Sequence, residues 1–218
     1  LVTKVWISNA GDERAAKSID ESLRKLETDY IDLLLIHQAF GDYYGTYRAM
    51  QKALEAGKVR AIGLSNFVDA RFVDLVENME VKPAVLQLET HVFSQQKRMR
   101  ELMAPYGTRL MAWAPLAEGR NGIFTHPTLM AIGAKYGKTA AQTALRFLMA
   151  EDVIAIPKSV HRERLVENFS IDDFELSAED LDAIRALDGG KPMFADFNDP
   201  TLAKFLLEYD AKFNLERQ

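Results

Sequence analysis

The sequence predicts an α/β fold, a (β/α)8 TIM barrel in which six of the eight βα units are present. Six short apolar runs are continuous rather than alternating, as is typical of strands buried on both faces of a parallel sheet. Amphipathic segments long enough for crossover helices lie between them. Polar residues stand where each run ends, which indicates side chains gathered at one end of a barrel.

The six expected strands cover residues 1–4, 31–37, 59–66, 83–89, 109–115 and 153–159. Helices are expected between them at 12–27, 46–57, 68–79, 94–106 and 128–149, with a loop before the last of these. The residues of the first helix that are expected to share one apolar stripe are Ala15, Ala16, Ile19, Leu23 and Leu26. Gly57 and Gly107 suit the left-handed conformation that follows a helix.

Three further helices are expected after the sixth strand, at 162–169, from Ser177 to about Gly189, and from about 201 to 213. Ser177 and Asp180 match a capping box, and Gly189 resembles a stop. The carboxyl end therefore matches a finished barrel with appended helices. Because a barrel needs eight strands to remove its edges, we expect the two missing units at the front of a single domain, 1–218.

Polar residues decide between the barrel and an open doubly wound sheet. Such residues follow six separate strands, whereas an open sheet would concentrate them at one switch point. No GxGxxG follows any strand, so the usual dinucleotide loop of the open sheet is missing. The barrel is the favoured architecture.

Composition excludes several classes of function. A formal net charge of −5 without a dense Lys/Arg tract argues against nucleic acid as the main partner. No run is apolar for long enough to span a membrane, and no signal-peptide layout is present, so a cytoplasmic chain is expected. The four His residues have no metal-ligand spacing and Cys is absent, so we expect neither a metal nor a disulfide.

Four stretches, LVTKVW, DLLLIHQAFGDYYG, AIGLSNF and IPKSVHRERLVENF, occur in this order, each at the end of a strand. In that order and spacing they resemble an aldo-keto reductase from its third barrel strand to its carboxyl terminus. The resemblance implies a (β/α)8 barrel, NADPH as cofactor and reduction of a small-molecule aldehyde or ketone to an alcohol.

The resemblance also implies catalytic roles for two residues. Lys4 matches the lysine that makes the family's proton-donating tyrosine more acidic, and His37 matches the histidine that orients the carbonyl. Without the resemblance, Lys4 reads as a solvated terminal lysine and His37 as a core histidine. The family's Asp and Tyr belong to the first two units, so no residue here is assigned to proton donation; Tyr43 and Tyr44 lie in a loop that shapes the substrate pocket.

Cofactor-binding residues are implied at four strand ends. Ser65 and Asn66 match the pair that binds the nicotinamide carboxamide, with Gln87 assisting. Trp113 matches an aromatic ring lying flat on the nicotinamide, although a core Trp is an alternative. The residues implied beneath the pyrophosphate are Ala114, Pro115 and Leu116, and Ala114 stands where a hydroxyl residue is commoner.

The adenosine end of the cofactor is implied at the sixth strand and the helix after it. Lys158, Ser159 and Arg164 match residues that hold the 2′-phosphate, which favours NADPH over NADH. The resemblance further includes Val160, and it places Glu167 and Asn168 at the adenine. Arg164, Glu167 and Asn168 share one face of the helix. The alternative for this stretch is a solvated helix start.

Two alternatives to the reductase stay open. One is a nucleotide-binding or regulatory member of the fold that holds NADPH without useful catalysis. The other is an inactive fragment, because the family's Asp and Tyr lie outside the 218 residues. The particular carbonyl substrate and the oligomeric state are not indicated by the sequence.

Overall fold

The computed structural model describes residues 1–215, with side chains through residue 212. Its sheet has six strands in the sequential order β1-β2-β3-β4-β5-β6, and the pairings are parallel. This arrangement confirms the predicted α/β class with its βα units. The strands are β1 (Val2–Val5), β2 (Leu33–Ile36), β3 (Ile62–Ser65), β4 (Val85–Glu89), β5 (Arg109–Trp113) and β6 (Ile154–Ala155).

The chain divides into two compact units, which are described separately. Unit 1 holds Leu1–Gln87, Glu101–Thr108 and the described residues from Ala195 onward, and unit 2 holds Leu88–Arg100 and Arg109–Phe194. Strand β4 and helix α4 (Lys97–Met103), which continues into a 3-10 turn (Ala104–Tyr106), contribute to both. The expectation of one barrel domain over 1–218 stays a prediction.

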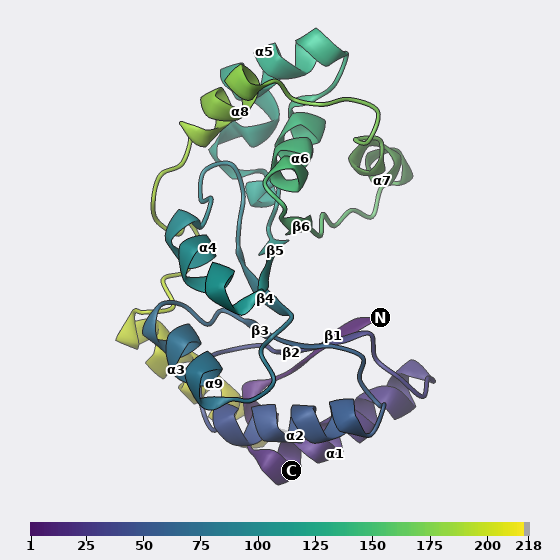
Figure 1. Ribbon diagram of the computed structural model, residues 1–218, viewed down its shortest axis with the longest axis vertical. Coiled ribbons are helices and arrows are strands. Elements are labelled where there is room, and N and C mark those ends of the chain that lie inside the picture. Colours follow the sequence, from purple (N-terminus) through teal and green to yellow (C-terminus); the bar gives the residue numbers. More distant parts are fainter. Residues whose placement is uncertain (216–218) are drawn as a thin grey trace. The chain divides into compact units, whose positions relative to one another are not determined.

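Unit 1 buries its strands β2 and β3 beneath helices. Its helices are α1 (Asp12–Leu26), α2 (Tyr43–Glu55), α3 (Ala70–Asn78) and α9 (Pro200–Leu215), with a 3-10 turn (Ile7–Asn9) after β1. Helices α1 and α2 lie side by side (Figure 1). Every residue of β2 and β3 is buried, and the Phe67 and Phe72 rings are fully enclosed. Burial on both strand faces explains why these runs carry no polar alternation.

Gly63 in β3 is required by close packing within unit 1. A Cβ built there would lie 2.5 Å from the Val85 carbonyl oxygen of β4 and 2.7 Å from a Leu35 methyl of β2. Neither distance is tolerable for a real side chain, so the neighbouring strand and its side chains can approach only because this position has no Cβ.

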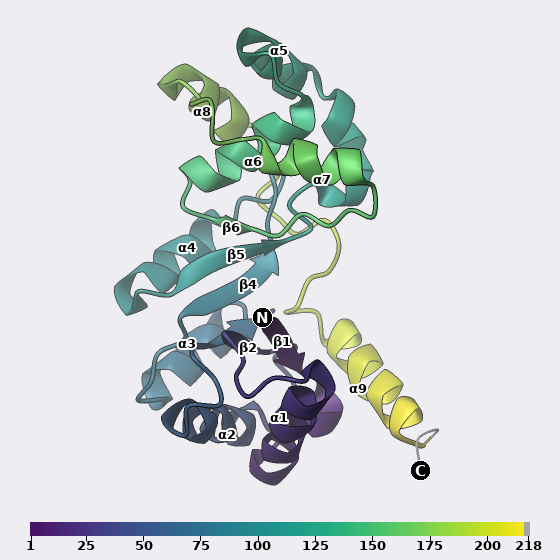
Figure 2. The same cartoon turned by 90° about the vertical axis from the view of Figure 1, so that its right-hand side faces the viewer.

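Unit 2 consists mainly of helices around β5 and β6. They are α5 (Pro127–Tyr136), α6 (Ala140–Ala150), α7 (Arg162–Phe169) and α8 (Ala178–Arg185), with a 3-10 segment (Ala117–Thr125) after β5. Helix α6 packs against both α5 and α7 (Figure 2). Ser177 and Asp180 form the expected capping box of α8. None of the helices in residues 1–215 is long and apolar enough to cross a membrane.

Three expectations about element bounds are wrong. The helix expected over 128–149 is two helices, because Gly137 adopts φ +65° and Thr139 then caps α6. The strand expected over 153–159 is only Ile154–Ala155, since Pro157 has no N–H for the ladder. Helix α8 ends at Arg185, so Gly189 is not its stop.

Candidate functional site

Lys4 and His37 lie on neighbouring strands of unit 1. Lys4 is near the end of β1, in register with Leu35 of β2, and the His37 backbone N–H donates to the Val5 carbonyl at 3.0 Å. The Trp6 ring meets His37 edge-on, with centroids 4.8 Å apart. The strand ends therefore bring the two predicted catalytic residues of unit 1 together.

Burial sets the charge state of this pair. Burial lowers the pKa of His37 to about 4, and the positive charge of Lys4 contributes to the decrease. His37 is therefore a neutral imidazole at pH 7, able to donate one hydrogen bond without carrying charge. Burial also lowers the pKa of Lys4, whose ammonium has no hydrogen-bond or ion-pair partner within residues 1–215.

Tyr43 and Tyr44 do not serve as the missing proton donor in this arrangement. The Tyr43 hydroxyl donates to an Asp74 carboxylate oxygen at 3.3 Å, and the Tyr44 hydroxyl donates to the Asp74 backbone carbonyl at 3.1 Å. Burial and the Asp74 carboxylate raise the pKa of Tyr43, and burial raises that of Tyr44 to about 12. An efficient general acid near neutral pH needs a pKa shifted in the opposite direction.

Ser65, Asn66 and Gln87 meet where β3 and β4 end. Ser65 is in register with Gln87, and the Asn66 backbone N–H donates to the Gln87 carbonyl at 3.0 Å. The Asn66 side-chain amide donates to the His37 carbonyl and to Gln38 Oε1, both at 3.2 Å. Asn66 has φ +63°, a left-handed conformation that Asn tolerates better than most residues. Through Asn66, the ends of β2, β3 and β4 form one connected group.

The Ser65 hydroxyl provides a test of whether this group fits a cofactor. Ser65 is 1% exposed, and its Oγ has no hydrogen-bond partner in the described structure. Buried hydroxyls without partners are rare, and a ligand that is absent is one established cause. A carboxamide offers both a donor and an acceptor, so this strand end fits one.

In unit 2, the residues from Trp113 to Leu116 turn sharply away from β5. Trp113 is half-buried, and its carbonyl accepts a hydrogen bond from the Thr90 N–H at 3.2 Å. Ala114 has φ +51°, a strained conformation for a residue with a Cβ, and such positions cluster at functional sites. Pro115 is buried, and Leu116 packs against the Leu145, Ile171 and Phe174 cluster. Leu116 therefore has a packing role in unit 2.

The segment between β6 and α7 is open to solvent. Lys158, Val160 and Arg164 are exposed, Val160 at 77%. Neither Lys158 nor Arg164 forms an ion pair in the part of the chain that the structure describes. The Ser159 hydroxyl accepts from the His161 N–H at 3.1 Å at the start of α7. Two cations beside a helix start form a place where a phosphate dianion can bind.

Glu167 and Asn168 face other parts of unit 2. The Glu167 carboxylate accepts from the Thr139 hydroxyl at 2.6 Å, at the amino end of α6. Asn168 lines a groove of about 610 Å³ together with residues of β6, α6 and α7. Their contact with adenine stays a prediction, as do the cofactor roles of the other residues.

Two functional candidates in unit 2 were missed by sequence reasoning about the site. His91 is fully buried, and its Nε2 lies 3.2 Å from a carboxylate oxygen of Glu89. The Phe194 ring lies 5.5 Å from that of Trp113. The one available signal was Glu89, an acidic residue that is buried at the end of β4. Nothing local marks Phe194.

Known proteins resemble this chain along most of its length. The model of the aldo/keto reductase family matches residues 1–189. A glyoxal reductase of Bacillus subtilis (strain 168) is 40% identical over 188 residues, which are 86% of this chain and 67% of that protein.

Solved structures agree. MGS-M4, an aldo-keto reductase enzyme from a Medee basin deep-sea metagenome library, is 38% identical with a TM-score of 0.88, covering 91% of this chain and 74% of that one. A mutant of Gox0644 in complex with NADPH is 34% identical with a TM-score of 0.87 over the same shares. The predicted resemblance is thereby confirmed: the chain belongs to the aldo/keto reductase family.

Proposed function

We propose that the chain belongs to an NADPH-dependent reductase that converts a small aldehyde or ketone to an alcohol. The observation that carries the proposal is the buried, partnerless Ser65 hydroxyl beside Asn66, at a strand end connected to His37. A glyoxal reductase among the relatives and an NADPH complex among the similar structures support the substrate class and the cofactor.

In this proposal each unit contributes its own residues. NADPH, when bound, supplies the hydride. Ser65, Asn66 and Gln87 hold the carboxamide, while Lys158, Ser159 and Arg164 hold the 2′-phosphate. Trp113 provides an aromatic face for the nicotinamide, and Ala114, Pro115 and Leu116 lie beneath the pyrophosphate. Val160 belongs to the cofactor-binding segment between β6 and α7.

In this proposal His37 and Lys4 act on the carbonyl oxygen of the substrate. A neutral His37 donates a hydrogen bond to that oxygen, which orients the carbonyl without needing protonation of the ring. The Lys4 ammonium, half-buried and without an ion-pair partner in the described residues, stabilises negative charge that develops on the oxygen. Proton donation is assigned to no residue of the chain.

The test is steady-state oxidation of NADPH by the chain with a panel of aldehydes and ketones that includes glyoxal and methylglyoxal. Saturable oxidation that falls by about 10²-fold in His37→Gln is expected, because loss of one positioned hydrogen-bond donor to the reacting oxygen costs about 10²–10³-fold. His161→Gln, which changes an exposed histidine, is the matched control and retains full activity. Absence of turnover with every compound would reject the reductase.

A second candidate is an NADPH-binding protein without carbonyl reduction. The observation that favours it is that the hydroxyls of Tyr43 and Tyr44, at the start of α2, both donate to Asp74 and have raised pKa values. This candidate predicts NADPH binding, seen as quenching of Trp113 fluorescence, with no oxidation of NADPH by any carbonyl compound. The same panel therefore distinguishes the two functions.

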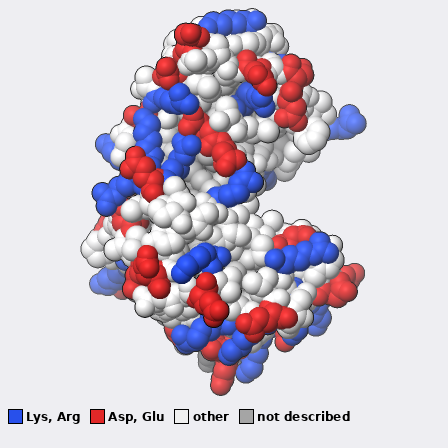
Figure 3. Space-filling model, viewed as in Figure 1, with Lys and Arg blue, Asp and Glu red and all other residues white. Residues whose placement is uncertain are grey.

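The charge distribution agrees with a small-molecule substrate. Acidic and basic side chains are intermingled on the face shown in Figure 3, and the net charge is −5. A nucleic-acid partner would need a continuous basic face. In the described residues no group of three or more His, Asp or Glu side chains could hold a metal ion. Cytoplasmic location stays a prediction.

A further inference from the structure

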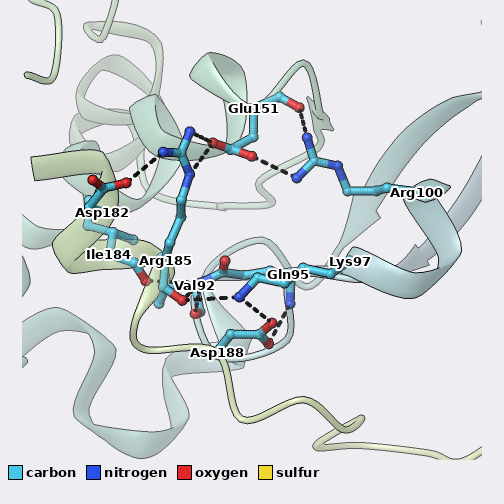
Figure 4. A network of polar contacts seen from close by, with 9 residues as sticks. All are labelled: Val92, Gln95, Lys97, Arg100, Glu151, Asp182, Ile184, Arg185 and Asp188. Atoms are coloured by element: carbon cyan, nitrogen blue, oxygen red, sulfur yellow. Dashed lines mark hydrogen bonds and ion pairs between the residues drawn. The ribbon is translucent and has the colours of Figure 1, made fainter. Parts of the chain in front are cut away.

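The segment of unit 2 that follows α8, residues 186–194, is bound to the loop between β4 and α4. The Gln95 side-chain amide donates to the Val92 carbonyl at 2.8 Å and to the Ile184 carbonyl at 2.9 Å, and the Gln95 backbone N–H donates to Asp188 at 3.1 Å (Figure 4). Lys97 forms an ion pair with Asp188 at 3.3 Å. Because Gln95 is 4% exposed, these hydrogen bonds are shielded from competing water.

Ion pairs also hold the carboxyl end of α8. Arg185 of α8 and Arg100 of α4 both bind the Glu151 carboxylate (Figure 4). Burial raises the pKa of Glu151, but the two guanidinium groups outweigh burial and leave it below its usual value. A carboxylate shared by two arginines therefore fixes the start of the segment.

Further along, a buried carboxylate holds the segment's other end. Glu89, which is 3% exposed, accepts hydrogen bonds from the backbone N–H groups of Met193 at 2.5 Å and Phe194 at 3.1 Å. His91 Nε2 lies 3.2 Å from the same carboxylate. Burial raises the pKa of Glu89, yet the hydrogen bonds from His91, Met193 and Phe194 lower it further than burial raises it. Glu89 is therefore an ionised anchor.

This anchor determines where the Phe194 ring lies. The ring is tilted at 56° to Trp113 with centroids 5.5 Å apart, a favourable aromatic geometry. The Arg120 guanidinium lies 4.7 Å from the Phe194 centroid. Since Glu89 binds the N–H of Phe194 itself, loss of the carboxylate frees the residue that supports Trp113.

We propose that Glu89 is a positioning residue that acts through the Met193 and Phe194 backbone to hold Phe194 against Trp113, so that the Trp113 ring is in place before the cofactor binds. The proposal rests on the proposed function for the identity of the cofactor. Ordering one free side chain weakens binding by about two- to tenfold, so loss of the anchor weakens NADPH binding by that factor.

The experiment measures Trp113 directly in the cofactor-free protein. The chain has two Trp residues, so Trp6→Phe leaves Trp113 as the only one. In that background Glu89→Gln replaces an acceptor of two N–H groups by a side chain with one acceptor oxygen. The Stern–Volmer constant for acrylamide quenching is expected to rise about twofold, and NADPH titration is expected to show two- to tenfold weaker binding.

A double-mutant cycle separates positioning from a general structural role. Phe194→Leu keeps the backbone donors and removes the ring, so it is expected to raise quenching as Glu89→Gln does. The chain that carries both Glu89→Gln and Phe194→Leu is then expected to have a Stern–Volmer constant no higher than that of either single variant, because both substitutions act through one contact. Asp188→Asn, which loosens the segment away from Phe194, is the matched control and leaves quenching unchanged.

The proposal would be overturned if the increases in the Stern–Volmer constant caused by Glu89→Gln and Phe194→Leu were additive. It would also be overturned if Asp188→Asn raised that constant as much as Glu89→Gln does. If Glu89→Gln does not fold, the Phe194→Leu variant decides the matter. Unchanged acrylamide quenching of Trp113 in that variant would also overturn the proposal. Failure of the unsubstituted chain to bind NADPH, with the quenching changes as expected, would reject the proposed function and leave the positioning of Trp113 by Glu89 supported.

Discussion

The strand ends of unit 1 and the β6–α7 segment of unit 2 differ in burial and in pairing. Ser65, Asn66 and Gln87 are at most 5% exposed, and Asn66 connects three strand ends. Lys158 and Arg164 are exposed, without ion-pair partners in the described residues. The chain therefore pre-arranges groups for neutral, directional hydrogen bonding in unit 1 and leaves solvated the two cations that are predicted to bind phosphate in unit 2.

This difference has a physical reason. An amide that binds a carboxamide must have its dipoles fixed in advance, which burial and internal hydrogen bonds achieve. A cation that binds a phosphate dianion acts over a longer range and would lose hydration if buried without a partner. Substitutions that break internal hydrogen bonds in unit 1 should therefore change stability, and those at β6–α7 should change cofactor affinity without changing stability.

The largest expected effect is that of Asn66→Ala in unit 1. It removes the donor to the His37 carbonyl and to Gln38, and it replaces Asn, which tolerates φ +63°, by Ala, which tolerates it less well, so the free energy of unfolding should fall by about 3 kcal/mol. Urea unfolding measures the change. Asn66→Gly lacks the backbone penalty and should lose about 1 kcal/mol less. Equal stability of Asn66→Ala and the unsubstituted chain would contradict the account.

The second effect belongs to unit 2 and changes affinity alone. Arg164→Ala should weaken NADPH binding by about tenfold, as expected for loss of one charge-assisted hydrogen bond, and leave NADH binding unchanged. Its melting temperature should stay the same, because the side chain is exposed and has no ion-pair partner in residues 1–215. Arg162→Ala, a neighbouring exposed arginine on α7, is the control. Equal losses for both cofactors would show that Arg164 does not contact the 2′-phosphate.

A third effect concerns pH. The pKa of His37 is lowered to about 4, so between about pH 4 and 6.5 the unfolded chain binds a proton that the folded chain does not. Stability from this group is therefore fully present above about pH 6.5 and declines as the pH falls through that window. With allowance for partial exposure, His37→Gln should remove a decline on the order of 1 kcal/mol. Unfolding free energies at pH 7 and pH 4.5 measure it; identical slopes in both proteins would count against a buried neutral imidazole.

The smallest effect is that of Ser65→Ala. No hydrogen bond is lost in the cofactor-free protein, so stability should be unchanged or rise by up to about 1 kcal/mol. NADPH affinity should nevertheless fall several-fold, because the hydroxyl then cannot bind the carboxamide. Differential scanning calorimetry measures the change in stability, and an NADPH titration measures the change in affinity. A clear loss of stability would mean that Ser65 has a structural partner.

Much of the fold could be predicted because it depends on local pattern. Continuous apolar runs located the strands, and Ser177 with Asp180 identified the start of α8. The break at Gly137 was missed because the apolar periodicity continues through it, and helical propensity alone does not say which glycine adopts positive φ.

The candidate site was predictable only in part, for a different reason. Recognisable motifs at the ends of consecutive strands contain Lys4, His37, Ser65 and Asn66. Because consecutive strands are neighbours in this sheet, the order of the motifs in the sequence is enough to place these residues at neighbouring strand ends. The Glu89 carboxylate and Phe194 N–H are separated by 105 positions, and no motif marks the partner. Contacts of that separation arise from tertiary packing, which single-sequence reasoning does not reach.

The measurement that tests the central claim most directly is a pair of titrations, NADPH and NADH, followed by Trp113 fluorescence in the Trp6→Phe chain and repeated after Lys158→Ala with Arg164→Ala. The account predicts saturable quenching with NADPH bound at least about tenfold more tightly than NADH, and loss of that preference in the doubly substituted chain. Equal affinity for both cofactors in the Trp6→Phe chain, or a preference that survives the two substitutions, would contradict it.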